Sequence, residues 1–128
     1  LGASPGGWSW VLHETGARVI AVDKAPLEGR IAGLPRIEFR PGSAFALDPA
    51  AIGRVDWLFC DVVCYPSRLL NLVRTWIEAG TCANFVCTLK FQGATDHTTA
   101  REFAAVPGGR LLQLHHNKHE LTWMKLAR

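Results

Sequence analysis

The chain begins with a glycine-rich stretch, residues 1–8, which restricts the fold more than any other part of the sequence. Glycine lacks a Cβ atom and tolerates positive φ, so a turn of this kind lets the backbone come close to a ligand. Apolar residues then recur at roughly helical spacing in Trp8, Val11 and Leu12, and Gly16 is placed to end the helix. The pattern predicts a glycine turn that leads directly into a short helix.

A β-like apolar run, residues 18–22, follows this helix and ends in Asp23. Turn, helix, strand and acid in this order are typical of a nucleotide-binding α/β unit, where the acid accepts hydrogen bonds from ribose hydroxyls. The dinucleotide fingerprint GxGxxG is broken, because Ser4 stands where its second glycine is required. We expect a ligand with an adenosine-like end, although three glycines before a helix also occur in plain connections.

The length of 128 residues, with 48% hydrophobic and 20% charged residues, is typical of one globular domain that buries its own core. No apolar stretch approaches the roughly 20 residues of a membrane span. We therefore expect a soluble, cytoplasmic protein without a membrane partner. The net charge of +3 fits a polyanionic partner without indicating one by itself, and the sequence gives no sign of an oligomeric state.

Neither the cysteines nor the histidines predict a metal site. Cys60 and Cys87 lie in apolar, strand-like runs, which suit small buried hydrophobes better than zinc ligands, and we expect no disulfide. Adjacent residues of a strand point to opposite faces, so His115 and His116, together with His119, converge poorly on one ion.

Strands and helices alternate along the rest of the chain. We expect strands over 36–40, 55–60 and 83–89, helices over 67–79 and 95–105, and helical turns in 45–52 interrupted by Pro49. Ser67 is the expected N-cap of the longest helix. The runs 111–116 and 121–126 predict a hairpin with Asn117-Lys118 as its turn.

Alternation of this kind predicts an α/β fold with a mainly parallel sheet and an antiparallel hairpin at its C-terminal edge. Ligands of such sheets bind beyond the carboxyl ends of the strands. Asp23, Asp61 and Lys90 stand at such ends, and Glu120 joins them because the second hairpin strand starts at that edge. Each is otherwise a solvated surface charge, the commonest place for Asp, Glu and Lys.

Five motifs occur in a fixed order: Leu-Gly-Ala-Ser-Pro-Gly-Gly-Trp at 1–8, Val-Asp at 22–23, Cys-Asp at 60–61, Leu-Lys at 89–90 and His-Glu-Leu-Thr at 119–122. Together they resemble the S-adenosylmethionine-dependent ribose 2′-O-methyltransferases of the FtsJ-like type, and most of all the members that methylate a cytidine of large-subunit ribosomal RNA. The resemblance covers essentially the whole chain and implies a Rossmann-like class I methyltransferase fold.

The resemblance also implies a set of cofactor contacts. Residues of the glycine turn would line the methionine end of S-adenosylmethionine, Asp23 would hold the ribose hydroxyls, and Ser43 to Phe45 would border the adenine. Family members usually carry an acid where Ser43 stands, so this contact lacks a charge here. The turn residues concerned are Ser4, Pro5, Gly6, Gly7 and Trp8.

Asp61, Lys90 and Glu120 would correspond to the last three members of the family's Lys-Asp-Lys-Glu tetrad, with Asp61 also near the cofactor. A ribose 2′-hydroxyl is a poor nucleophile, so the enzyme must align its oxygen and manage its proton. A lysine does this as a general base if its pKa is lowered, or as an orienting donor if it stays charged, and both roles remain open.

The first tetrad lysine, the strand before the glycine turn and an N-terminal RNA-binding portion lie upstream of Leu1 in family members. We therefore expect the chain to be a fragment, one methyltransferase domain over 1–128 without its first strand. Two alternatives remain, a methyltransferase acting on a small molecule or protein and a non-catalytic RNA-binding module that keeps the cofactor fold. A dehydrogenase is disfavoured because Ser4 breaks the fingerprint.

Overall fold

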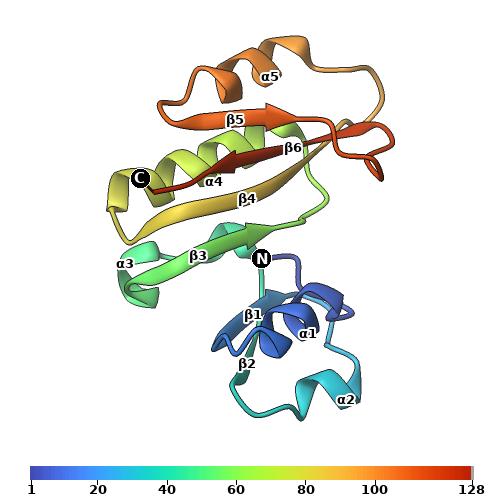
Figure 1. Ribbon diagram of the computed structural model, residues 1–128, viewed down its shortest axis with the longest axis vertical. Coiled ribbons are helices and arrows are strands. Elements are labelled where there is room, and N and C mark those ends of the chain that lie inside the picture. The colour runs from blue at the N-terminus through green and yellow to red at the C-terminus, as the bar shows by residue number, and fades with distance from the viewer. Residues whose placement is uncertain (128) are drawn as a thin grey trace. The chain divides into compact units, whose positions relative to one another are not determined.

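A computed structural model describes residues 1–127 and confirms the α/β class (Figure 1). The chain divides after Leu47 into two compact units. No helix in this described range is long and apolar enough to cross a membrane.

The first unit holds two parallel strands and short helices, close to the ranges that the sequence predicted. Its elements are α1 (Gly7–Glu14), β1 (Val19–Asp23), α2 (Gly29–Ala32), β2 (Ile37–Pro41) and the 3-10 helix η1 (Ala44–Ala46). Strand β1 pairs with β2 in parallel, with Val19 opposite Ile37 and Asp23 opposite Pro41. Val19, Ala21 and Leu27 form its buried core, and Leu12 of α1 packs against them.

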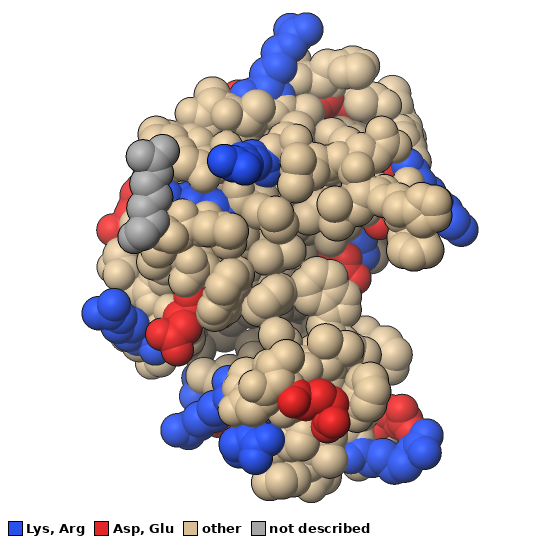
Figure 2. Space-filling model, viewed as in Figure 1, with Lys and Arg blue, Asp and Glu red and all other residues tan. Residues whose placement is uncertain are grey.

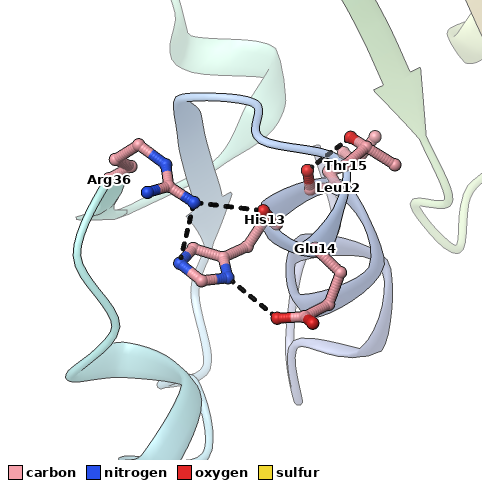
Figure 3. A network of polar contacts seen from close by, with 5 residues as sticks. All are labelled: Leu12, His13, Glu14, Thr15 and Arg36. Carbon is pink, nitrogen blue, oxygen red and sulfur yellow. Dashed lines mark hydrogen bonds and ion pairs between the residues drawn. The ribbon is translucent and has the colours of Figure 1, made fainter.

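A polar network fixes the end of α1 to the residue before β2 (Figure 3). The Arg36 guanidinium donates to the carbonyl oxygen of His13 at 3.3 Å and approaches His13 Nε2 at 3.4 Å. Because a guanidinium has only donors, Nε2 must be the acceptor, so Nδ1 carries the proton that faces Glu14 Oε1 at 3.1 Å. Arg36 makes these contacts from a left-handed backbone conformation with φ of 65°, which is unfavourable for a residue with a Cβ.

The second unit is a mixed four-stranded sheet with helices. Its elements are α3 (Pro49–Ile52), β3 (Val55–Cys60), α4 (Pro66–Ala79), β4 (Cys82–Lys90), α5 (His97–Ala104), β5 (Gly109–Leu112) and β6 (Glu120–Lys125). The strand order is β3-β4-β6-β5. Strand β3 is parallel to β4, whereas β6 is antiparallel to both of its neighbours, so β5 runs in the direction of β4. The predicted parallel pairing and the predicted antiparallel C-terminal hairpin are both present, in a sheet of mixed strand direction.

The core of the second unit lies between this sheet and helices α4 and α5 (Figure 1). Trp123 of β6 is fully buried, and its indole donates to the carbonyl oxygen of Phe103 at 3.0 Å. Its ring lies 5.5 Å from the ring of Phe103 and 6.0 Å from that of Phe85. A buried indole needs such an acceptor, because an unpaired N–H in the core is costly.

Several predicted details are wrong. Helix α4 starts one residue earlier than expected, with Tyr65 rather than Ser67 at its N-cap, because Pro66 takes the first helical position, where its missing N–H costs nothing. Pro49 begins α3 for the same reason instead of interrupting it, and Asp48 caps that helix by accepting from Ala50 N at 2.9 Å.

The hairpin is also different from the prediction. Strand β5 ends at Leu112, so the connection to β6 comprises residues 113–119 rather than two turn residues. Within it, Asn117 N donates to the carbonyl oxygen of Leu114, and Asn117 Oδ1 accepts from Leu114 N. These two bonds satisfy locally the backbone groups that a longer strand would have paired.

The expectation of a single sheet also differs from the structure. Strands β1 and β2 form one sheet and β3 to β6 another, since no ladder joins them within the described part of the chain.

We predict that Gly6→Ala destabilises the protein by about 1–3 kcal/mol. Gly6 has φ of 125°, and a Cβ there would lie 2.9 Å from two side-chain carbons of Ile31. Urea unfolding of the full-length protein measures the free-energy change. Gly29→Ala is the matched control, because Gly29 has ordinary φ and no atom within 4 Å of a built Cβ. Equal stability of the two variants would contradict the prediction.

Candidate functional site

The glycine turn of the first unit is held against the end of β1 by backbone bonds and by one carboxylate. Gly2 N and Ala3 N both donate to the carbonyl oxygen of Val22, at 3.0 and 3.1 Å. Asp23 accepts from Ser4 N through Oδ2 at 2.9 Å and from Ala25 N through Oδ1 at 3.0 Å. The predicted acid and the predicted turn are therefore in direct contact.

Asp23 keeps capacity for a ligand. A carboxylate has about four lone-pair positions, and these two backbone bonds occupy two of them. Its side chain is only half-buried, so ribose hydroxyls can donate to the remaining positions. The residue thus fits both a structural role in the turn and the ribose-binding role expected from the sequence.

The other turn residues have distinct environments. Ser4 Oγ donates to the carbonyl oxygen of Pro26 at 2.8 Å, and Pro5 O accepts from Glu28 N at 2.8 Å. Gly6 is buried against Ile31, whereas a Cβ at Gly7 would meet nothing within 4 Å. Glycine at position 6 is therefore explained by packing and its backbone angle. Trp8 is 42% exposed at the start of α1.

Ser43 caps the 3-10 helix η1. Its Oγ accepts from Phe45 N at 3.2 Å, which ties together the two residues expected to border adenine. One lone pair and the hydroxyl proton of Ser43 are left for a ligand. A serine at this position can still exchange a hydrogen bond with an adenine amino group, but the bond lacks the charge that an acid would give.

Asp61, Lys90 and Glu120 are brought together in the second unit. The Lys90 ammonium lies 3.1 Å from Asp61 Oδ1 and donates to the carbonyl oxygen of Asp61 at 2.9 Å. Lys90, the last residue of β4, is paired directly with Glu120, the first residue of β6. The three residues therefore lie at one edge of the sheet, where the strand directions predict them.

The residues next to Lys90 and Glu120, Phe91 and His119, also contact each other beyond the strand ends. Phe91 N donates to the carbonyl oxygen of His119 at 3.3 Å, and the two rings lie 5.4 Å apart. His119 Nε2 also lies 3.0 Å from Thr95 Oγ1. Since these contacts flank Lys90 and Glu120 in sequence, they fix the register at the site. His119 thus supports the strand pairing beside Lys90 and Glu120.

Asn117, which the sequence predicts only as a turn residue, contacts the site through its side chain. Asn117 Nδ2 donates to Glu120 Oε1 at 3.3 Å, and Asn117 Oδ1 accepts from Thr122 Oγ1 at 3.2 Å. The only available signal was an asparagine three residues before the acid, which is too common a pattern to single out.

All four cysteines are free, and Cys60 and Cys87 are completely buried opposite each other on β3 and β4. A hydrogen bond with the Cys60 thiol, together with burial, raises the pKa of Cys87. Burial raises the pKa of Cys64 to about 11. Within residues 1–127, no group of three His, Cys, Asp or Glu side chains is arranged to hold a metal ion.

We predict that alkylation of Cys64 by iodoacetamide accelerates about tenfold per pH unit between pH 8 and pH 10. The thiolate is the reactive form, and a pKa of about 11 keeps it scarce over this whole range. Peptide mass spectrometry of the folded full-length protein measures the rate, with circular dichroism to verify folding at each pH. The rate for an ordinary thiol, whose pKa is about 8.5, levels off between pH 9 and pH 10. The same levelling for Cys64 would show that the raised pKa is wrong.

Comparison with known proteins gives the family. Residues 1–102 match the family model of the FtsJ-like methyltransferases. A protein named ribosomal RNA large subunit methyltransferase M from Alkalilimnicola ehrlichii is 37% identical over 95% of this chain and 35% of its own length. The protein of the same name from Halorhodospira halophila is 35% identical over 95% of this chain and 37% of its own length.

A third protein of this name, from an Azoarcus species, is 39% identical over 70% of the chain and 24% of its own length. The chain thus spans about a third or less of the length of the relatives that it matches. The resemblance drawn from the five motifs is confirmed by these matches. On the family match and the extent of these similarities, the chain belongs to the FtsJ-like methyltransferase family.

Proposed function

We propose that this chain is the catalytic domain of an S-adenosylmethionine-dependent RNA 2′-O-methyltransferase acting on large-subunit ribosomal RNA, with a cytidine as the target. The observation that carries the proposal is the contact of Lys90 with Asp61 and its direct pairing with Glu120. The names of the relatives support the class of RNA, and the family supports methyl transfer.

The proposed cofactor contacts lie mainly in the first unit. Asp23 has free acceptor positions for ribose hydroxyls, Gly7 leaves open space for a ligand, and Ser43 has a hydroxyl available for the adenine. Ser4, Pro5, Gly6, Trp8 and Phe45 complete the proposed set, with Asp61 as a further contact. When bound, S-adenosylmethionine supplies a methyl group on a positively charged sulfur and leaves as S-adenosylhomocysteine.

Lys90 is the proposed residue that aligns the ribose 2′-oxygen. An ammonium has three N–H donors, and the two contacts with Asp61 use two of them. The third is available to a substrate oxygen, which favours the role of orienting donor in this arrangement. Glu120 pairs with Lys90 across β4 and β6, and its proposed role is to receive a proton or to balance the charge of the lysine.

In the view of the second unit in Figure 2, Lys and Arg side chains stand apart from one another rather than forming one continuous patch. Since phosphate neutralisation supplies much of the affinity for nucleic acid, we infer that this face contributes little to RNA binding. The proposed location is the cytoplasm, with no membrane or metal partner.

We predict that Lys90→Ala lowers the rate of methyl transfer by about 100-fold to 10,000-fold, the usual effect of losing a group that handles a proton. Binding of S-adenosylmethionine should survive, because the proposed cofactor residues are unchanged. The assay uses the full-length protein, labelled cofactor and unmodified large-subunit ribosomal RNA, with calorimetry for cofactor binding.

Lys125→Ala is the matched control, because Lys125 lies at the other end of β6, opposite Phe85. Undiminished turnover in Lys90→Ala would contradict the role of Lys90. Transfer that is insensitive to ribonuclease would instead indicate a small-molecule or protein substrate, and cofactor binding without transfer by the wild type would indicate a non-catalytic module.

A further inference from the structure

Asn117 lies in the connection between β5 and β6, and its side-chain amide makes three contacts. Its Oδ1 accepts from Leu114 N at 2.7 Å and from Thr122 Oγ1 at 3.2 Å. Its Nδ2 donates to Glu120 Oε1 at 3.3 Å. The amide therefore joins its own connection, the first residue of β6 and a buried threonine of the same strand.

These partners determine which way the amide faces. The backbone N–H of Leu114 can only donate, so the oxygen of the Asn117 amide must point toward it. The NH₂ group then has to point toward Glu120, whose ionised carboxylate can only accept. A flipped amide would put two donors face to face at Leu114 and two acceptors face to face at Glu120, so a single orientation satisfies all three contacts.

Strand pairing by itself does not fix the Glu120 carboxylate. The β4–β6 register places the backbone of Glu120 opposite Lys90, but the side chain keeps three rotatable bonds and is only partly buried. Ordering a glutamate side chain costs on the order of 1–2 kcal/mol. The bond from Asn117 meets that cost in the folded protein, before a substrate arrives, which is how rigid supporting contacts improve catalytic sites.

We propose that Asn117 is a positioning residue that holds the carboxylate of Glu120 in its working orientation for methyl transfer. This inference rests on the proposed function. A neutral amide suits the task because it donates to the carboxylate without adding a positive charge that would compete with Lys90 for Glu120.

A double-mutant cycle in the full-length protein tests whether Asn117 acts through Glu120. The four proteins are the wild type, Asn117→Ala, Glu120→Ala and the double variant, assayed with labelled S-adenosylmethionine and unmodified large-subunit ribosomal RNA. We expect Asn117→Ala to lower kcat about tenfold, with KM for RNA and for cofactor unchanged. In the Glu120→Ala background the same change should alter kcat less than twofold, because the group that Asn117 positions is gone.

Asn117→Asp is the second variant, because it keeps an acceptor for Leu114 and Thr122 and replaces only the donor. At pH 7 this variant should lose kcat, because the new carboxylate and that of Glu120 lie about 3 Å apart and repel each other. Near pH 4 the repulsion is relieved by protonation, so the variant should fold like the wild type. Asn71→Ala, at an exposed position on α4, is the control and should leave kcat unchanged.

An equal loss of kcat from Asn117→Ala in both backgrounds would overturn the proposal, since it would mean that Asn117 supports only the connection. Wild-type kcat in Asn117→Asp at pH 7 would overturn it as well. If the wild type methylates RNA but Glu120→Ala retains full kcat, the positioning role fails while RNA methylation stands. If the wild type does not methylate RNA, the proposed function itself fails.

Discussion

The second unit depends on the way β6 enters its sheet. This strand is antiparallel to both neighbours, so it starts at the edge where the parallel strand β4 ends. A slip of one residue would turn Glu120 to the opposite face of the sheet and expose Trp123, which is fully buried against Phe103 and Phe85. The packing of one tryptophan and the placement of one acid are thus fixed by the same register, and core stability and site geometry are difficult to change separately.

The first unit depends in a similar way on one side chain with two uses. The carboxylate of Asp23 joins the glycine turn to the segment after β1, through Ser4 N and Ala25 N. The same carboxylate is the group proposed to hold a ribose. Because backbone donors take only part of its accepting capacity, ligand binding need not break the turn. The turn is therefore already shaped by the protein's own contacts, which lowers the entropic cost of binding.

Much of this fold was predictable, because strong local patterns agree with tertiary structure. The apolar run at 55–60 is β3 with the same bounds, and helix 67–79 differs from α4 by one residue. The convergence of Lys90 and Glu120 followed from strand direction, a property of topology that the sequence pattern carries. The hairpin register did not follow, since residues 113–116 have strand-like composition, yet the backbone N–H and C=O of Leu114 bond to Asn117 instead of to a strand. The contacts that one amide makes within a seven-residue connection produce no periodic pattern of apolar residues in the sequence. The roles of the site residues in binding and catalysis stay predictions.

The position of β6 also has a consequence for biosynthesis. It lies inside the sheet, between β4 and β5, although among the described residues it comes after all the other strands in chain order. A ribosome releases the chain from its N-terminal side, so β3, β4 and β5 emerge before the strand with which both β4 and β5 pair. Lys90 consequently leaves the ribosome well before the acid that will face it. Before residues 120–125 have left the ribosome, this edge of the sheet lacks β6. Lys90 and Glu120 therefore come together only when β6 pairs with β4.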